Sequence, residues 1–277
     1  ISRYAKDYDI ILANQNLTAW PVMLSWTSAK KVYYIQAYEP EYYELREDKR
    51  SILLKYISRF SYLLPLFRIV NSPIYYKYKW LRCNRHVPPG VDFSVFYRKV
   101  ITEFDRPNEP IILGCIGRRE IEKGTLYVFK AFEYLLQVGV NVELHVAFGN
   151  LPSEQSSHPK CKIIVPQNDK ELGEYYRSLD IMIAPGLVQL GAPHYPVLES
   201  MACGVPVITT GYLPATNENA WIVPVKDHKA IALAVINILD NKEVVKSKTN
   251  KAYNSILRFG WAVVSEEMID NFKSIKP

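Results

Sequence analysis

Long hydrophobic runs, paired cysteines, internal repeats and low-complexity tracts are all absent from this 277-residue sequence. No apolar run approaches the roughly 20 residues that a membrane-spanning helix needs. The four cysteines have neither metal-ligand nor paired spacing, so we expect reduced, structural thiols in a cytoplasmic protein. They are Cys83, Cys115, Cys161 and Cys203. These absences argue against a membrane-spanning protein and against a disulfide-stabilised domain.

The composition, with 48% hydrophobic and 22% charged residues, is typical of a globular protein with one large or two modest cores. The net charge of +6 comes from the amino-terminal third. Residues 1–94 contain 14 Lys and Arg against 8 Asp and Glu, whereas residues 95–277 contain 20 of each. Within the basic part, residues 49–85 interleave cations with Ile, Leu, Phe, Tyr and Trp.

Two interpretations of this basic stretch remain open. Residues 49–85 could contact an anionic membrane surface, or they could form a solvated face on helices whose other face is core. A nucleic-acid backbone would also attract such a stretch, but no nucleic-acid-binding motif accompanies it. We therefore expect no nucleic-acid partner.

Strand-like and helix-like segments alternate along most of the chain, which favours an α/β fold with a parallel sheet covered on both faces. Asp227 is a good cap for the helix that follows it. The expected strands lie near residues 9–13, 31–36, 67–72, 111–117, 142–148, 161–166, 180–185, 205–209 and 221–224.

One segment combines a helix start, a carboxylate, a helix stop and a strand in the sequence YPVLESMACGVPVIT, residues 195–209. Pro196 suits the first turn of a helix, Glu199 is expected in that turn, and Gly204 closes the helix. A carboxylate held at the carboxyl end of a parallel strand can bind the hydroxyls of a ribose. The alternative is an ordinary first-turn charge.

A second segment, residues 111–124 with the sequence IILGCIGRREIEKG, places a buried-type strand before a basic turn. The helix after it is expected to bury Leu126, Phe129, Phe132 and Leu136. Arg118 and Lys123 would then lie near a helix start, where free amides already favour anions. The alternative is a surface basic turn.

Together these segments resemble the GRxxxxKG and PxLExMAxGxPVIxT motifs of GT-B glycosyltransferases, in particular glycosyltransferase family 4. The resemblance implies a Rossmann-like donor domain over residues 95–277, with a carboxyl-terminal crossover helix. Residues 1–94 would be a partial acceptor domain, and HVPPGVD at 86–92 resembles the interdomain turn, with the boundary near 90–108. The resemblance also implies that Glu199 binds the ribose and that Arg118 and Lys123 hold the diphosphate as catalytic cations.

The motif positions imply further site residues. The family's second acid, expected eight positions before Glu199, is Gly191 here, so His194 and Glu39 are the nearest candidates for a role beside the sugar. The loop after residue 165 is expected either to contact the base or to form a plain turn. The remaining donor-side candidates are Gly117, Gln167, Asn168, Tyr195, Pro196 and Val197, and Gln36 joins Glu39 on the acceptor side.

The resemblance implies a hexosyltransferase that uses a nucleoside-diphosphate sugar, needs no metal and retains the anomeric configuration. The loop at 191–196 and the segment YIQAYEP at 34–40 resemble rhamnosyltransferase-like members, which suggests a deoxysugar donor. The acceptor would be a glycan or a lipid-linked glycan. A catalytically inactive sugar-nucleotide-binding module and another GT-B enzyme, such as an epimerase, remain alternatives. We expect the front of the first domain to be missing, and therefore weak transfer by this chain alone.

Overall fold

The computed structural model describes residues 3–46, 48–83, 85–98, 109–150 and 157–275. It divides into two compact units, Ile1–Gly90 together with Trp261–Pro277, and Val91–Gly260. Of the boundary region that the sequence predicts, residues 99–108 lie outside the described residues. The assignment of the units to an acceptor side and a donor side stays a prediction.

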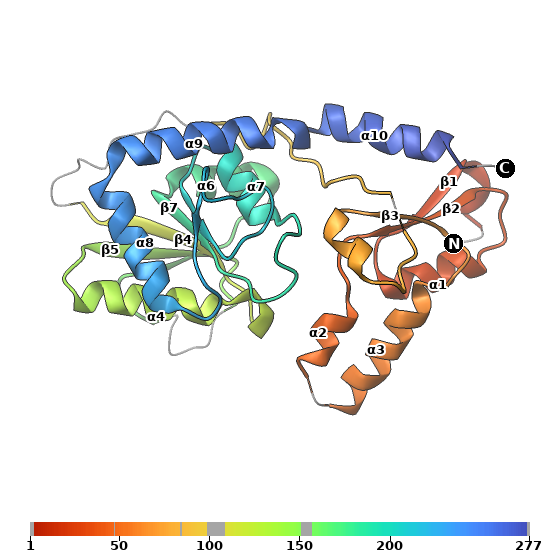
Figure 1. Cartoon of the computed structure of the whole chain (residues 1–277), viewed down its shortest axis with the longest axis horizontal. Coiled ribbons are helices and arrows are strands. Elements are labelled where there is room, and N and C mark those ends of the chain that lie inside the picture. The colour runs from red at the N-terminus through yellow and green to blue at the C-terminus, as the bar shows by residue number, and fades with distance from the viewer. Residues whose placement is uncertain (1–2, 47, 84, 99–108, 151–156, 276–277) are drawn as a thin grey trace. The chain divides into compact units, whose positions relative to one another are not determined.

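The first unit contains a three-stranded parallel sheet in the order β1-β2-β3, and its strands confirm those predicted from the sequence. Val32 and Ile69 from this sheet pack against Val87 and Val264, and Val264 brings helix α10 into the core of the unit. The elements, visible in Figure 1, are η1 (Ala5–Asp7), β1 (Ile10–Ala13), α1 (Asn16–Leu24), β2 (Lys30–Ile35), α2 (Pro40–Glu44), α3 (Lys49–Ser61), β3 (Phe67–Val70), η2 (Pro73–Lys77) and α10 (Trp261–Lys273).

The second unit contains a six-stranded parallel sheet in the order β6-β5-β4-β7-β8-β9. It confirms the predicted alternation of strands and helices. The elements are β4 (Ile111–Ile116), η3 (Ile121–Lys123), α4 (Thr125–Gln137), β5 (Val142–Ala147), β6 (Cys161–Ile164), α6 (Asp169–Ser178), β7 (Ile181–Ala184), α7 (Tyr195–Ala202), β8 (Val207–Thr209), β9 (Trp221–Ile222), α8 (His228–Asp240), α9 (Lys242–Ile256) and η4 (Leu257–Phe259).

Both faces of this sheet are covered, as the uninterrupted apolar strands predict. Because successive side chains of a strand point to opposite faces, β7 sends Met182 into a core with α6, α7 and α9, and Ile183 into a second core with α4 and α8. Figure 1 shows α4 and α8 running along the sheet. The predicted cap is confirmed, since the Asp227 carboxylate accepts a hydrogen bond from the Ala230 amide at 2.9 Å.

Two local predictions were wrong. Helix α7 begins at Tyr195, so Glu199 is its fifth residue and lies beyond the first turn. Helix α4 buries Val128, Phe129, Phe132 and Leu135 and leaves Leu126 exposed, because the sheet contacts a stripe that is rotated from the expected one.

All four cysteines are free thiols. Among the described residues, no three His, Cys, Asp or Glu side chains are placed to hold a metal ion. No helix in the described part of the chain is both long and apolar enough to cross a bilayer.

Candidate functional site

The candidate site lies at the carboxyl edge of the six-stranded sheet, where the strand order reverses. From β4 the chain adds β5 and β6 on one side of the sheet, and from β7 it adds β8 and β9 on the other. The loops that follow β4 and β7 therefore diverge, and open α/β sheets bind ligands in the crevice between such loops. Most of the donor-side residues predicted from the sequence lie in these two loops or at the start of α7.

The turn after β4 is closely packed and needs its glycines. The Gly117 amide donates to the Ala147 carbonyl at 2.8 Å, and a Cβ at Gly117 would lie 2.5 Å from the Gly149 oxygen. Gly124 has φ of +71° and passes so close to β7 that a Cβ would lie 2.0 Å from the Pro185 oxygen. This turn is thereby held against the end of β7.

Two cations project from this turn in different surroundings. Arg118 is exposed, whereas Lys123 is half-buried. Burial lowers the pKa of Lys123, and the charge of Arg118 lowers it further. The two charges are thus close enough to repel each other, so an anion between them would relieve both burial and repulsion.

The loop between β7 and α7 is fixed by its neighbours. The Gly191 amide donates to the Gly211 carbonyl at 2.8 Å, which ties it to the loop after β8, and Gly191 itself has φ of +87°. The Leu187 amide donates to the Glu122 carbonyl at 2.8 Å, which ties the same loop to the turn after β4. The loops after β4 and β7 are therefore coupled through a backbone hydrogen bond.

His194 is held at the start of α7. Its ring stacks on Tyr212 with a centroid separation of 4.6 Å and an interplanar angle of 26°. Its Nδ1 atom is buried and has no hydrogen-bond partner among the described residues. Burial lowers the pKa of His194 to about 3, with further contributions from the charges of Lys123 and Arg118. The imidazole is therefore neutral at physiological pH, and it lies near both cations.

Glu199 is the fifth residue of α7 and is 9% exposed. Its Oε2 atom accepts a hydrogen bond from the Tyr176 hydroxyl at 2.7 Å. Burial raises the pKa of Glu199 to about 7; the Tyr176 hydrogen bond opposes this rise, and the charge of Asp169 adds to it. Tyr176 is fully buried and packs edge-on against Phe96. The Tyr176 hydroxyl is therefore held in place, and its hydrogen bond orients the Glu199 carboxylate.

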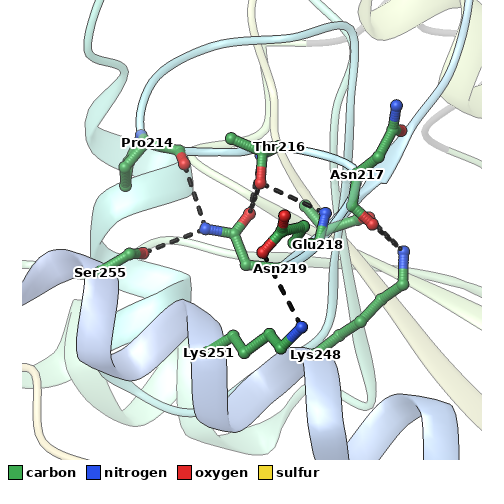
Figure 2. A network of polar contacts seen from close by, with 9 residues as sticks. Pro214, Thr216, Asn217, Glu218, Asn219, Lys248, Lys251 and Ser255 are labelled. Atoms are coloured by element: carbon green, nitrogen blue, oxygen red, sulfur yellow. Dashed lines mark hydrogen bonds and ion pairs between the residues drawn. The ribbon is translucent and has the colours of Figure 1, made fainter.

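The loop after β8 is in turn anchored to helix α9, as Figure 2 shows. The Asn219 side chain donates to the Pro214 carbonyl and to the Ser255 hydroxyl, both at 3.1 Å, and accepts from the Thr216 amide at 2.7 Å. Lys248 from the same helix donates to two further carbonyls of this loop. This network holds the segment that carries Tyr212, on which His194 stacks.

The remaining donor-side candidates, Gln167 and Asn168, lie in an exposed turn before α6. Asn168 caps this helix by accepting from the Glu171 amide at 3.0 Å, and the Gln167 amide donates to the Glu171 carboxylate at 2.8 Å. These bonds support the plain-turn interpretation, and a role in contacting the base stays a prediction.

The two acceptor-side candidates lie in the first unit. Gln36 is exposed, and its carbonyl accepts from the Tyr75 hydroxyl at 3.1 Å. Glu39 accepts from the Asn16 amide at 3.1 Å through Oε1 and from the Tyr62 hydroxyl through Oε2. Burial raises the pKa of Glu39. Both carboxylate oxygens therefore serve internal hydrogen bonds, and a role toward an acceptor stays a prediction.

Sequence reasoning missed Tyr176 and Tyr212, the two tyrosines that orient Glu199 and His194. No local pattern marks either one, because each contacts its partner across more than ten residues of sequence. Tyr176 precedes the apolar strand β7 and Tyr212 follows the apolar strand β8. Many core tyrosines lie next to apolar strands, so this position alone does not indicate a functional role.

The family model for "Glycosyl transferases group 1" matches residues 110–241. The chain is 26% identical over 154 residues to the capsular polysaccharide biosynthesis glycosyltransferase CapM of Staphylococcus aureus, covering 50% of this chain and 39% of that protein. It is 24% identical over 199 residues to a probable sucrose-phosphate synthase of Thermosipho melanesiensis, covering 66% of this chain and 46% of that protein. The alignments thus span less than half the length of these relatives.

Among solved structures, the Anabaena protein HepE in complex with UDP-glucose superimposes with a TM-score of 0.77 at 14% identity, covering 99% of this chain and 81% of that one. At this identity the likeness shows the fold alone. The chain has the two-unit α/β fold of GT-B proteins, and the region that carries the candidate site, residues 110–241, is similar to the group 1 glycosyltransferases.

Proposed function

We propose that this protein transfers a hexose from a nucleoside-diphosphate sugar to a glycan or a lipid-linked acceptor in polysaccharide or glycoconjugate synthesis. The observation that carries the proposal is that two cations after β4, and a neutral imidazole and a buried carboxylate at α7, follow the two strands at which the strand order reverses. The match to the group 1 family model, the similarity to the capsular polysaccharide glycosyltransferase CapM and the complex of HepE with UDP-glucose support the same chemistry.

The diphosphate is proposed to lie against Arg118 and Lys123. As the bond to the sugar breaks, negative charge grows on the leaving diphosphate, and fixed cations stabilise that charge without reorganising. Half-burial of Lys123 strengthens the interaction because water screens it less. Metal-independent transfer with retention of configuration is part of the proposal.

His194 is proposed to hydrogen-bond the donor sugar as a neutral ring. A pKa of about 3 makes the imidazole a poor general acid near neutral pH. Its buried Nδ1 has no partner in the described protein, so a sugar hydroxyl or a bound water could supply the missing hydrogen bond. This assigns His194 to orientation of the donor and not to proton transfer.

Glu199 is proposed to bind the ribose. Tyr176 occupies Oε2, so Oε1 is the oxygen that a ribose hydroxyl would reach. Tyr195, Pro196 and Val197 would line the path to it at the helix start, and Gln167 and Asn168 would border the base. The donor sugar is proposed to be a hexose, with UDP-glucose and dTDP-rhamnose as the first two to test.

The test is release of free nucleoside diphosphate from a panel of sugar nucleotides, together with calorimetric titration of UDP, dTDP and GDP. We expect binding of at least one diphosphate to this chain, and loss of that binding in Arg118→Ala/Lys123→Ala. Lys130→Ala, on the exposed side of α4, is the matched control. Absence of binding to all three diphosphates at millimolar concentration would refute the proposal.

A second candidate is a catalytically inactive sugar-nucleotide-binding module. Gly191 favours it, because a left-handed glycine stands where the family motif has an acid. The same panel distinguishes the candidates, since a binding module retains donor affinity and releases no diphosphate in the presence of any acceptor. An epimerase would instead convert the donor into a second sugar nucleotide without an acceptor.

A further inference from the structure

Helix α3 exposes four of its apolar side chains to solvent and turns its serines toward the protein, while Leu54 and Ile57 are half-buried. Ser51, Ser58 and Ser61 are buried. The outward stripe has the spacing of an amphipathic helix, and Leu53 at its centre is 60% exposed. The stripe consists of Ile52, Leu53, Tyr56 and Phe60, which we call the α3 apolar stripe.

Hydrogen bonds fix this inverted orientation. The Ser58 hydroxyl accepts from the buried Asn16 side chain of helix α1, and the Ser61 hydroxyl lies within hydrogen-bond distance of Tyr33 on β2. Asp48 caps the helix by accepting from the Ser51 amide at 3.0 Å. Rotating α3 to bury its leucines would leave Asn16 without this partner, and an unsatisfied buried polar group is costly.

The charge of the helix is of one sign. Residues 49–61 contain four cations and no acid. Lys49 and Arg50 are exposed at the amino end, while Lys55 and Arg59 contact Glu44 of α2 at 2.9 and 3.1 Å. The apolar stripe is therefore bordered by two exposed cations at its amino end and by two others that pair with Glu44 along its length.

The next exposed segment of the same unit has the same character. Residues 76–83 expose Tyr76 and Trp80 among Lys77, Lys79 and Arg82, again without an acid. Tryptophan and tyrosine are enriched at membrane–water interfaces. A second protein chain would also cover an apolar stripe. The excess of cations around Tyr76 and Trp80 instead favours a partner that offers both an apolar interior and a negatively charged surface.

We propose that the α3 apolar stripe docks the protein on an anionic membrane surface. The helix would lie in the interfacial plane with its stripe among the acyl chains and Lys49 and Arg50 at the headgroups. At about 1.5 Å per residue its 13 residues span about 20 Å, too short to cross a bilayer. This inference rests on the proposed function, because docking on a membrane would bring the protein to a lipid-linked acceptor.

The experiment is co-sedimentation of the full chain with vesicles of phosphatidylcholine alone and of phosphatidylcholine containing phosphatidylglycerol. We expect binding to the anionic vesicles that weakens with salt, and at least about tenfold weaker binding of Leu53→Gln/Phe60→Gln. Lys49→Glu/Arg50→Glu should weaken it by about tenfold or more. Leu233→Gln, at an equally exposed leucine of α8 in the other unit, should bind as the unsubstituted chain does.

Circular dichroism of each variant confirms that the fold is kept, and titration with UDP separates the two proposals. Diphosphate binding that is unchanged in the Leu53→Gln/Phe60→Gln variant supports a lipid role of the stripe, whatever the donor specificity. Equal binding to neutral and anionic vesicles, no vesicle binding, or undiminished binding of the stripe variant would overturn the inference. So would a concentration-dependent dimer that this variant abolishes, because the occupant would then be a second copy.

Discussion

Under the proposed function, Glu199 links the stability of the ligand-free protein to its affinity for a nucleoside, and we expect Glu199→Gln to separate the two. In the folded chain burial raises the pKa of this carboxyl from 4.5 to about 7. The folded state therefore holds the proton more tightly than the unfolded state. As pH rises from about 4.5 to about 7, this group lowers the free energy of unfolding, because the folded state must ionise a buried acid.

The magnitude follows from the pKa. A tenfold change in a protonation equilibrium corresponds to about 1.4 kcal/mol, so ionised Glu199 costs up to about 3 kcal/mol at pH 8. Glutamine keeps an oxygen that can accept from Tyr176 and never ionises. We expect Glu199→Gln to unfold at higher temperature than the unsubstituted chain at pH 8, and at nearly the same temperature at pH 5.

Nucleoside binding should change in the opposite direction. A hydrogen bond to a charged group contributes about 1.5–3 kcal/mol, so Glu199→Gln should bind uridine about 10- to 150-fold more weakly at pH 8. Uridine is the better probe because a diphosphate titrates near neutral pH itself. Thermal unfolding followed by circular dichroism, and competition against a fluorescent nucleotide, measure the two effects. Glu174→Gln, at an exposed glutamate of α6, is the control.

Two results would refute the reasoning. If Glu199→Gln unfolds at a lower temperature at pH 8, the carboxylate is stabilising and its burial does not dominate. If uridine affinity is unchanged while the stability rises, Glu199 is a buried acid that does not bind ribose.

Three further perturbations test the site and its support. Lys123→Ala should weaken UDP binding by more than about tenfold, with the difference shrinking at high salt, and should leave uridine nearly unaffected, as titrations at two salt concentrations would show. Asn219→Ala removes a buried side chain with four hydrogen bonds; it should lower the free energy of unfolding by about 1–3 kcal/mol in urea titration. Asp227→Ala removes the cap of α8 and should lower it by about 0.5–2 kcal/mol in the same titration, without altering UDP binding.

The fold was largely predictable because its strands are local signals. The strand β7, with the sequence IMIA, is apolar on both faces and has to be buried on both. Helices α4, α6 and α7 separate β4 from β5, β6 from β7 and β7 from β8 in the second unit, which leaves few topologies other than a parallel sheet. The detail that failed was the phase of the helices. Leu126 was assigned to the wrong face because the apolar residues of α4 allow more than one buried stripe, and Glu199 was assigned to the first turn because helix starts shift by a residue or two.

Candidate residues could be proposed from the sequence where short motifs carry them, and not where the arrangement depends on long-range packing. Arg118 and Lys123 could be proposed because glycines bracket their turn, and their role stays a prediction. The protonation state of His194 could not be predicted, because it depends on burial and on two cations from another loop. The sequence indicates that a histidine stands at the helix start, and the packing determines that it is neutral.

Helix α3 shows most plainly what a sequence pattern leaves undecided. Its amphipathic spacing is evident in the sequence and predicts one apolar face, but the pattern does not determine whether this face is turned inward. In the first unit, contacts with other elements favour the serine face for the interior. The buried Asn16 side chain of α1 donates to Ser58, 42 positions away, Ser61 lies within hydrogen-bond distance of Tyr33, and Lys55 and Arg59 pair with Glu44. Replacing both partners by apolar residues, as in Asn16→Leu/Ser58→Ala, should therefore weaken the preference for this orientation and with it the binding of anionic vesicles.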